Sequence, residues 1–233
     1  AGHLRGERSM SRYAVIGGTG LCELPGVTIL AHTEVETPYG LPSAALTTLH
    51  WQGKELLFLA RHGQPHRIPP HRVNYRANLW ALKQAGVSDI IAVAAVGGID
   101  RDMAPGEIVV PDQLIDYTWG RAHTYSDRSD EPLAHVDFTD PYTESLRRQL
   151  LAAATELALP CCAGGVYGAA QGPRLETRAE IDRMARDGCT LVGMTGMPEA
   201  GLARELGLNY ACLAVVVNPA AGRGPDVITM DDI

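Results

Sequence analysis

The sequence has no long apolar segment and no excess of basic residues. No uninterrupted apolar run reaches the ~18 residues expected of a membrane-spanning helix, and the first residues lack the basic-then-apolar order of a secretory signal. The 27 acidic side chains outnumber the 20 Lys and Arg side chains, which gives a formal charge of -7. We therefore expect neither a membrane protein, a secreted protein nor a nucleic-acid coat, and any anion site must be local.

Cysteine is also scarce and lacks a functional spacing. The five residues contain no CxxC pair and no zinc-ligand pattern, and an odd number that includes an adjacent pair is a poor disulfide framework. Free thiols of this kind are typical of a reducing compartment, so we expect a cytoplasmic protein. The cysteines are Cys22, Cys161, Cys162, Cys189 and Cys212.

The chain of 233 residues is long enough for one well-filled core. Residues 1–9, AGHLRGERS, resemble a remnant of a cloning vector and are left out of the fold prediction. No repeat, low-complexity segment or linker divides the remainder. We expect a single domain over residues 10–233.

Short β-rich runs alternate with amphipathic helix patterns along the chain, which predicts an α/β fold with a central mixed sheet flanked by helices. Paired runs within residues 27–60 have no helix between them, so we expect antiparallel hairpin strands there. The predicted strands are RYAVIGG, SAALTTLHW, ELLFLAR, DIIAVAAVGG, GEIVVPDQLI, CTLVGM and YACLAVVVN, and the predicted helices are HRVNYRANLWALKQAG, DPYTESLRRQLLAAATELAL and TRAEIDRMARDG.

Capping residues delimit these helices. Asp140, followed by a proline, is placed to cap the second helix. Thr177 and Glu180 have the spacing of a capping box at the third. Gly86 and Gly188 stand where a helix commonly ends on a glycine.

The first strand run closes with VIGGTG, Val15–Gly20. Backbone N–H groups of such a turn can face an anion, but a plain turn explains the glycines equally well. The motif is not a dinucleotide fingerprint, because the third glycine of GxGxxG is missing and no long helix pattern follows.

The segment ARHGQPHRIPPHR, residues 60–72, places three arginines and three histidines after a strand. His62, His66 and His71 lack the helical spacing and acidic partners of a metal site. The alternatives are a solvated basic loop and a small-anion site, and concentrated positive charge in an acidic protein favours the latter. Arg61 would supply the fixed charge and His62 a hydrogen-bond donor.

Two further strand ends, AAVGGI (Ala94–Ile99) and VGMTGMPE (Val192–Glu199), have features of ligand-binding turns. The competing interpretation is that their methionines are core filler. No GxSxG elbow or nucleophilic cysteine motif is present, so covalent catalysis is not expected. Glu180 and Glu199 are interpreted as helix-start residues rather than a glycosidase pair.

Taken in order, IGGTG, ARHG followed by HRVNYRANLWALK, PGEIVVPDQLID, QGPRLET and GMTGMPE resemble the trimeric purine nucleoside phosphorylase family. Within it, the motifs are most similar to the methylthioadenosine phosphorylase branch. The resemblance extends from Met10 to Ile233. It implies phosphorolysis, in which phosphate attacks C1′ of a nucleoside and releases the base, with inorganic phosphate as co-substrate and no metal or organic cofactor.

The resemblance also assigns site residues. It places phosphate beside Thr19, Arg61, His62, the Ala95 backbone and Thr195. His62 and Asn218 are the expected catalytic residues. It places Met194 along the ribose, Leu175 against the purine, and Gln171, Asn218 and Ala220 at the purine edge.

Asn218 departs from the adenosine-type members of this branch, which carry aspartates at this position and at that of Ala220. An asparagine NH₂ can donate to N7 or to a 6-oxo group, so a hypoxanthine-type base is expected. The alternative is that Asn218 only caps the turn before Pro219. Gln171 replaces a family glutamate, which led us to expect guanosine to be the poorer substrate.

Met230 falls at the family's 5′ pocket, beside Thr229. An apolar side chain there favours a methylthio group over a hydroxyl, although ordinary packing is an equally good explanation. Family members continue into a C-terminal helix where this sequence ends. The resemblance implies a homotrimer in which a neighbouring subunit closes the 5′ pocket, with the loop His123–His135 as the candidate.

Together these features predict phosphorolysis of S-methyl-5′-thioinosine to hypoxanthine and 5-methylthioribose 1-phosphate, a purine-salvage reaction of a pentosyltransferase. The substrates would be a small nucleoside and phosphate, with neither nucleic acid nor membrane as partner. Alternatives are an inosine/guanosine phosphorylase, a methylthioadenosine phosphorylase, a hydrolytic nucleosidase, which the phosphate residues disfavour, and a non-catalytic nucleoside- or phosphate-binding protein.

Overall fold

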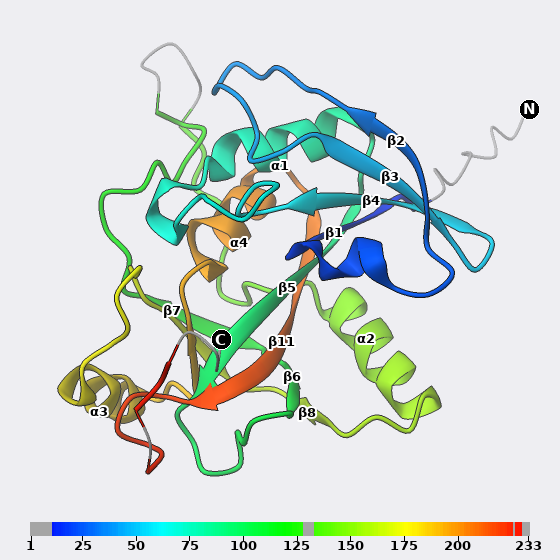
Figure 1. Ribbon diagram of the computed structural model, residues 1–233. Helices are drawn as coiled ribbons and strands as arrows, with labels where there is room; N and C mark the ends of the chain where they lie inside the picture. Colours follow the sequence, from blue (N-terminus) through cyan, green and yellow to red (C-terminus); the bar gives the residue numbers. More distant parts are fainter. Residues whose placement is uncertain (1–10, 128–132, 226, 230–233) are drawn as a thin grey trace, which may run out of the picture.

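The computed structural model describes residues 11–127, 133–225 and 227–229. Its strands form one mixed sheet of eleven strands with helices around it, which confirms the predicted α/β class (Figure 1). The strands are β1 (Tyr13–Gly17), β2 (Thr28–Thr33), β3 (Leu46–Trp51), β4 (Lys54–Ala60), β5 (Asp89–Gly98), β6 (Ile108–Val110), β7 (Gln113–Asp116), β8 (Cys161–Ala163), β9 (Val166–Ala169), β10 (Leu191–Gly193) and β11 (Asn209–Pro219). The helices are α1 (Tyr75–Gln84), α2 (Glu144–Glu156), α3 (Arg178–Asp187) and α4 (Gly196–Glu205), with 3₁₀ turns at Thr19–Glu23 and Pro70–Arg72.

The long parallel strands β5 and β11 form the centre of the sheet (Figure 1). Strand β1 joins β5 and β4 in parallel, so β1, β4, β5 and β11 all end at the same edge. Their sequences are near-continuous apolar runs because both faces of this region are covered. In α/β sheets the carboxyl edge of parallel strands is the usual place for a ligand.

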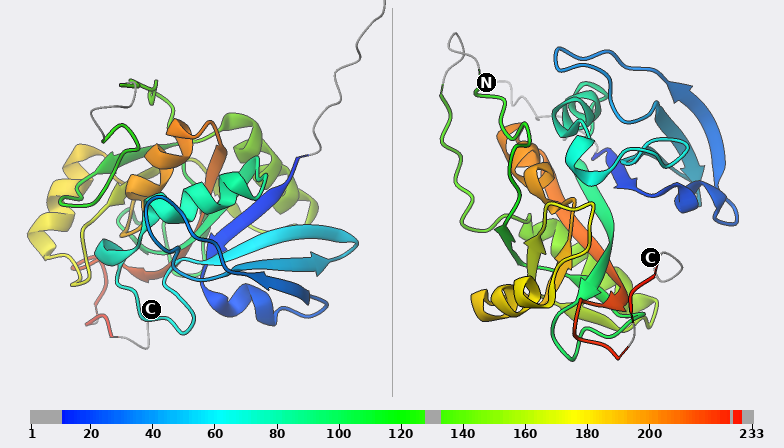
Figure 2. Two further views of the ribbon diagram at one scale, coloured as in Figure 1. Left: turned by 90° about the horizontal axis from the view of Figure 1, so that it is seen from above. Right: turned by 60° about the vertical axis from the view of Figure 1, so that its left-hand side comes forward.

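Strands β2, β3 and β4 form the antiparallel extension predicted from residues 27–60. The β3–β4 turn consists of Gln52 and Gly53, whose φ angles of 50° and 77° suit the two-residue turns that follow the twist of a hairpin. Strand β2 is exposed along its length and forms one edge of the sheet (Figure 2).

The helices fix the two sides of the central strands. Helices α2 and α4 pack on β11, and α1 packs on α4, whereas α3 lies at the end of the molecule away from β2–β4 (Figures 1 and 2). The predicted capping box of Thr177 and Glu180 is confirmed, as is a left-handed Gly188 with φ of 99° after α3. None of the helices in the described ranges is both long and apolar enough to cross a bilayer.

The predicted start of the second helix was wrong. Helix α2 begins at Glu144 with Thr143 as its N-cap, not after Asp140. The preceding segment is held against β11, where the Thr143 N–H donates to the Tyr210 carbonyl over 2.8 Å and its hydroxyl accepts from the Tyr210 N–H over 2.9 Å. These tertiary bonds keep residue 143 extended, so the helix starts later than its sequence signal indicates.

The run GEIVVPDQLI was predicted as one strand and forms two. Strand β6 pairs with β11 and β8, and β7 pairs with β9. Pro111 lies between them and has no N–H for a sheet ladder. Strands β8 and β9 were not predicted, because both are short and two glycines interrupt the β-rich pattern between them. These glycines, Gly164 and Gly165, have φ angles of 126° and 134°.

Candidate functional site

A cavity of about 450 Å³ opens where β4, β5 and β11 end and where β10 passes into α4. It brings together most of the residues that the sequence assigned to phosphate and nucleoside. Gly18, and not the neighbouring Thr19, lines it at the end of β1. The assigned residues that line the cavity are Arg61, His62, Ala95, Leu175, Met194, Thr195, Asn218 and Ala220.

Small residues at the end of β5 keep this cavity open. Ala95 is exposed although it lies mid-strand between buried neighbours. A Cβ at Gly97 would lie 3.2 Å from Cγ1 of Val192 and 3.3 Å from Cα of Ala220, which is tighter than ordinary packing. Gly97 therefore allows β5 to pack closely against Val192 and Ala220, which also line the cavity.

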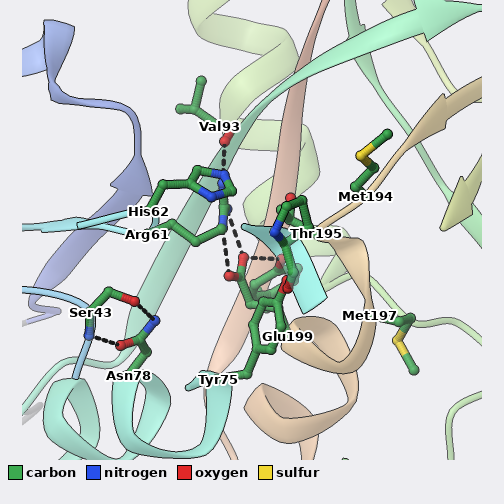
Figure 3. A network of polar contacts seen from close by, with 12 residues as sticks. Ser43, Arg61, His62, Tyr75, Asn78, Val93, Met194, Thr195, Met197 and Glu199 are labelled. Atoms are coloured by element: carbon green, nitrogen blue, oxygen red, sulfur yellow. Dashed lines mark hydrogen bonds and ion pairs between the residues drawn. The ribbon is translucent and has the colours of Figure 1, made fainter. Parts of the chain in front are cut away.

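Arg61 is fixed by a buried ion pair with Glu199. Its Nε lies 2.7 Å from Glu199 Oε2 and its Nη2 lies 2.8 Å from Oε1, with side-chain exposures of 3% and 0% (Figure 3). Nη1 donates to the Val93 carbonyl over 3.0 Å, and the Tyr210 hydroxyl donates to Glu199 Oε1 over 2.7 Å. These bonds use three of the five guanidinium N–H groups and leave two for a ligand.

The ion pair also sets the charge of this end of the cavity. Burial by itself lowers the pKa of Arg61, but the charge and hydrogen bonds of Glu199 outweigh it and hold the pKa above its ordinary value. Glu199 does start a helix, as interpreted from sequence, but its side chain is the counter-ion of Arg61. The sequence interpretation missed this role, because no local sequence feature marks a helix-start glutamate as the partner of a distant arginine.

His62 faces the cavity with its ring stacked on His66, the two centroids 4.5 Å apart. Its Nδ1 lies 2.8 Å from the Ile68 carbonyl and therefore carries a proton. Burial lowers the pKa of His62, and the charges of Arg61 and His66 act in the same direction. The neutral ring thus has an accepting Nε2, and not the free donor expected from the sequence; Nε2 becomes a donor only when the ring is protonated. No metal-binding cluster occurs here or elsewhere in the described ranges.

Tyr167 explains the glycines of GMTGMPE. A Cβ at Gly193 would lie 2.0 Å from the Tyr167 hydroxyl oxygen, and one at Gly196 would lie 2.7 Å from the ring. The Thr195 N–H donates to that hydroxyl over 3.4 Å. The glycines therefore let a fully buried tyrosine support the backbone that carries Thr195 into the cavity.

Asn218 lies at the end of β11, just after a register shift against β5. Its Nδ2 donates to the Pro219 carbonyl over 2.7 Å, and the side chain also lines the cavity. The local turn bond and the ligand-facing position are therefore compatible. One amide N–H and the carbonyl oxygen remain for a ligand.

Gln171 is not among the cavity-lining residues, which removes the basis for the expected weakness of guanosine. Its Oε1 accepts from the Trp119 N–H and from Arg121 Nε, each over 3.2 Å. Glu176 lines the cavity instead, and burial raises the pKa of its carboxyl group. Its place beside Leu175 in GPRLET was the available signal, and it was overlooked.

Met230 lies outside the described residues, so its predicted role stays a prediction. Ile228, two residues earlier, lines the cavity, as do Pro69 and Pro70. All three side chains are apolar.

The chain is similar to known proteins over most of its length. A family model described as the phosphorylase superfamily matches residues 12–233. A protein of Pseudomonas syringae pv. tomato named probable S-methyl-5′-thioinosine phosphorylase is 58% identical over 96% of this chain and 91% of its own length. The 6-oxopurine nucleoside phosphorylase of Pyrococcus furiosus is 44% identical over 96% and 85%. Methylthioadenosine phosphorylase from Schistosoma mansoni in complex with adenine has a TM-score of 0.89 at 33% identity, covering 95% of this chain and 84% of that one.

Proposed function

The chain belongs to the phosphorylase superfamily, and we propose that it is a nucleoside phosphorylase that converts S-methyl-5′-thioinosine and phosphate to hypoxanthine and 5-methylthioribose 1-phosphate. The observation that carries the choice of base is the presence of Asn218 and Glu176 in one cavity with Arg61 and Thr195. The relatives named for methylthioinosine and for 6-oxopurine nucleosides support the same choice.

In this reaction a phosphate oxygen forms a bond to C1′ while the bond from C1′ to N9 breaks. The electron pair of the broken bond goes to the purine, and the sugar carries positive charge in the transition state. The proton that hydrogenphosphate loses, passed directly or through water, neutralises the purine anion and gives hypoxanthine. Arg61, Thr195 and the backbone at Ala95 would hold the phosphate, and an Asn218 N–H would stabilise the purine at N7. We propose that inorganic phosphate is the co-substrate and that no metal or organic cofactor takes part.

The base would be selected by its pattern of donors and acceptors. A 6-oxopurine presents acceptors at N7 and O6, either of which suits the free amide N–H of Asn218, and a donor at N1, which suits the carboxylate of Glu176. Adenine presents a 6-amino donor and an N1 acceptor, so the carboxylate of Glu176 would repel its N1, and the free N–H of Asn218 would have no acceptor at position 6. Mispairing a buried polar edge costs about 1–3 kcal/mol.

The 5′ substituent would lie against the apolar side chains of Ile228, Pro69 and Pro70. A methylthio group suits such a wall better than a hydroxyl. One observation favours inosine as a second candidate substrate, because His66 also lines the cavity and can hydrogen-bond a 5′-hydroxyl.

We further propose a cytoplasmic homotrimer in which a neighbouring subunit closes the 5′ end. The loop after β7 exposes Trp119, Leu133 and Val136, apolar side chains of the kind that subunit interfaces cover. The cysteines of the described ranges are free thiols, in keeping with a reducing compartment. Light scattering on the purified protein measures the subunit number directly.

Phosphate dependence tests the reaction class. Purified protein is incubated with S-methyl-5′-thioinosine, with and without phosphate, while hypoxanthine is measured by absorbance and the sugar phosphate by ³¹P NMR. We expect equal amounts of both products, and only with phosphate. Release of hypoxanthine with free methylthioribose would establish a hydrolase, and binding without turnover would establish a binding protein.

Replacement of Glu176 by Gln is expected to lower kcat/KM for S-methyl-5′-thioinosine by about 10- to 100-fold, because a charge-assisted hydrogen bond contributes about 1.5–3 kcal/mol. Activity on methylthioadenosine should not fall, because the variant removes the carboxylate that opposes the N1 acceptor of adenine. The control is Glu156→Gln, the same change at an exposed position near the end of α2. Equal loss with both nucleosides would contradict the role of Glu176 in reading the base.

The dependence of kcat/KM on pH, compared between the wild type and Glu176→Gln, is a second test of the role of Glu176. The carboxyl group must be ionised to accept from N1, and burial raises its pKa. In the wild type, activity on 6-oxopurine nucleosides should therefore be lost as pH falls, at a higher pH than for an ordinary glutamate. The variant should lack this acidic limb.

A further inference from the structure

Arg121 is a second buried arginine beside the cavity, and it binds backbone oxygens. It lies in the loop after β7 and is 8% exposed. No carboxylate in the described ranges lies within ion-pair distance of its guanidinium. Arg61, by contrast, has Glu199 as a counter-ion.

The guanidinium of Arg121 joins two separate segments of the cavity wall. Nη1 donates to the carbonyls of Met194 and Met197 over 2.8 and 2.7 Å, and Nη2 donates to the Gln171 carbonyl over 2.8 Å. Nε donates to the side-chain oxygen of Gln171 over 3.2 Å. Longer contacts of 3.3 Å to the Tyr75 hydroxyl and 3.4 Å to the Ala170 carbonyl complete the set.

These two segments lead directly to residues that line the cavity. The Met194 side chain lines the cavity while its carbonyl binds Arg121. The other segment continues from Gln171 through Gly172 to Leu175 and Glu176. A Cβ at Gly172 would lie 2.4 Å from Met194 Sδ, so the two walls also meet each other there.

We infer that Arg121 is a positioning residue for nucleoside recognition, which sets the spacing between the Met194 wall and the wall carrying Leu175 and Glu176. The inference rests on the proposed function of the cavity. Burial of a charged group is costly, and Arg121 offsets the cost with hydrogen bonds that a planar fork can direct to several oxygens at once. A lysine ammonium is a point charge and cannot reach both segments in the same way.

The test is Arg121→Lys with Arg147→Lys as its matched control. Arg147 is also 8% exposed and binds the Pro111 and Val110 carbonyls over 2.9 and 3.2 Å, and it pairs with Glu144. Unlike Met194, neither Val110 nor Pro111 lines the cavity. We expect R121K to raise KM for the nucleoside by about 10- to 100-fold, the effect of a small misplacement of the binding walls, with KM for phosphate little changed. R147K should lose stability without either change in KM.

A purely structural role predicts a different result. If R121K and R147K alter stability and both KM values alike, or if the nucleoside KM of R121K equals that of the wild type, the inference is wrong. If R121K does not fold, Gln171→Met is the alternative variant, because it removes only one acceptor of Arg121. It should also raise the KM for the nucleoside. An unchanged KM would overturn the inference.

Binding without turnover separates this inference from the proposed function. If the wild type shows no phosphorolysis, the proposed function fails, but calorimetry with hypoxanthine still compares the variants. Weaker hypoxanthine binding in R121K than in R147K supports the positioning role, and equal binding contradicts it.

Discussion

Replacement of Asn218 by Asp is expected to move the preference of the enzyme from 6-oxopurine to 6-aminopurine nucleosides. A carboxylate can accept from a 6-amino group but repels the O6 of hypoxanthine, whereas the present amide donates to O6 or N7. Each mismatch at this buried edge costs about 1–3 kcal/mol, so the ratio of kcat/KM for methylthioinosine over methylthioadenosine should fall by about 10- to 100-fold. The measurement is that ratio, determined for wild type and variant in phosphate buffer.

Asn218→Ala is the control for this change. It removes both the donor and the acceptor, so activity should fall for both nucleosides while the preference contributed by Glu176 is retained. A variant Asn218→Asp with the same preference as the wild type would mean that the bond to Pro219 is the main role of the asparagine. Base selection would then rest on Glu176 alone.

Replacement of Glu199 by Gln is expected to reduce the free energy of unfolding by about 3–5 kcal/mol, because it leaves the buried Arg61 without its counter-ion. Thermal and urea unfolding measure this loss. Phosphate should stabilise the variant more than the wild type, since an anion bound at the cavity can replace the missing charge.

Two further variants test the origin of the effect. Glu55→Gln breaks an ion pair with Arg12 in which the two side chains are 51% and 39% exposed, and it should change stability by less than about 1 kcal/mol. The double variant Arg61→Met with Glu199→Leu removes both buried charges and should regain much of the stability while phosphate use is lost. Full phosphate use in the double variant would contradict the role of Arg61.

Much of the site could be predicted because its residues lie at strand ends. Parallel strands end at one edge, so ARHG after β4, the glycines of β5 and Asn218 of β11 had to meet there. The capping box of α3 and the β3–β4 hairpin are also local, and their residues determine them without tertiary help.

What the sequence did not reveal depends on contacts between distant segments. Glu199 became the partner of Arg61 across 138 positions, and a helix-start glutamate has no local mark of such a role. The side chain of Gln171 binds Arg121 and does not line the cavity. The contacts of Arg121 depend on how its loop folds, and the sequence does not show this. The start of α2 moved because Thr143 binds Tyr210.

The most direct test of the central claim is a comparison of kcat/KM for S-methyl-5′-thioinosine, methylthioadenosine and inosine, each supplied separately at saturating phosphate. The proposed contacts of Asn218 and Glu176 with the base predict that methylthioinosine and inosine both exceed methylthioadenosine. The apolar side chain of Ile228 predicts that methylthioinosine exceeds inosine. A higher value for methylthioadenosine than for methylthioinosine would contradict the account.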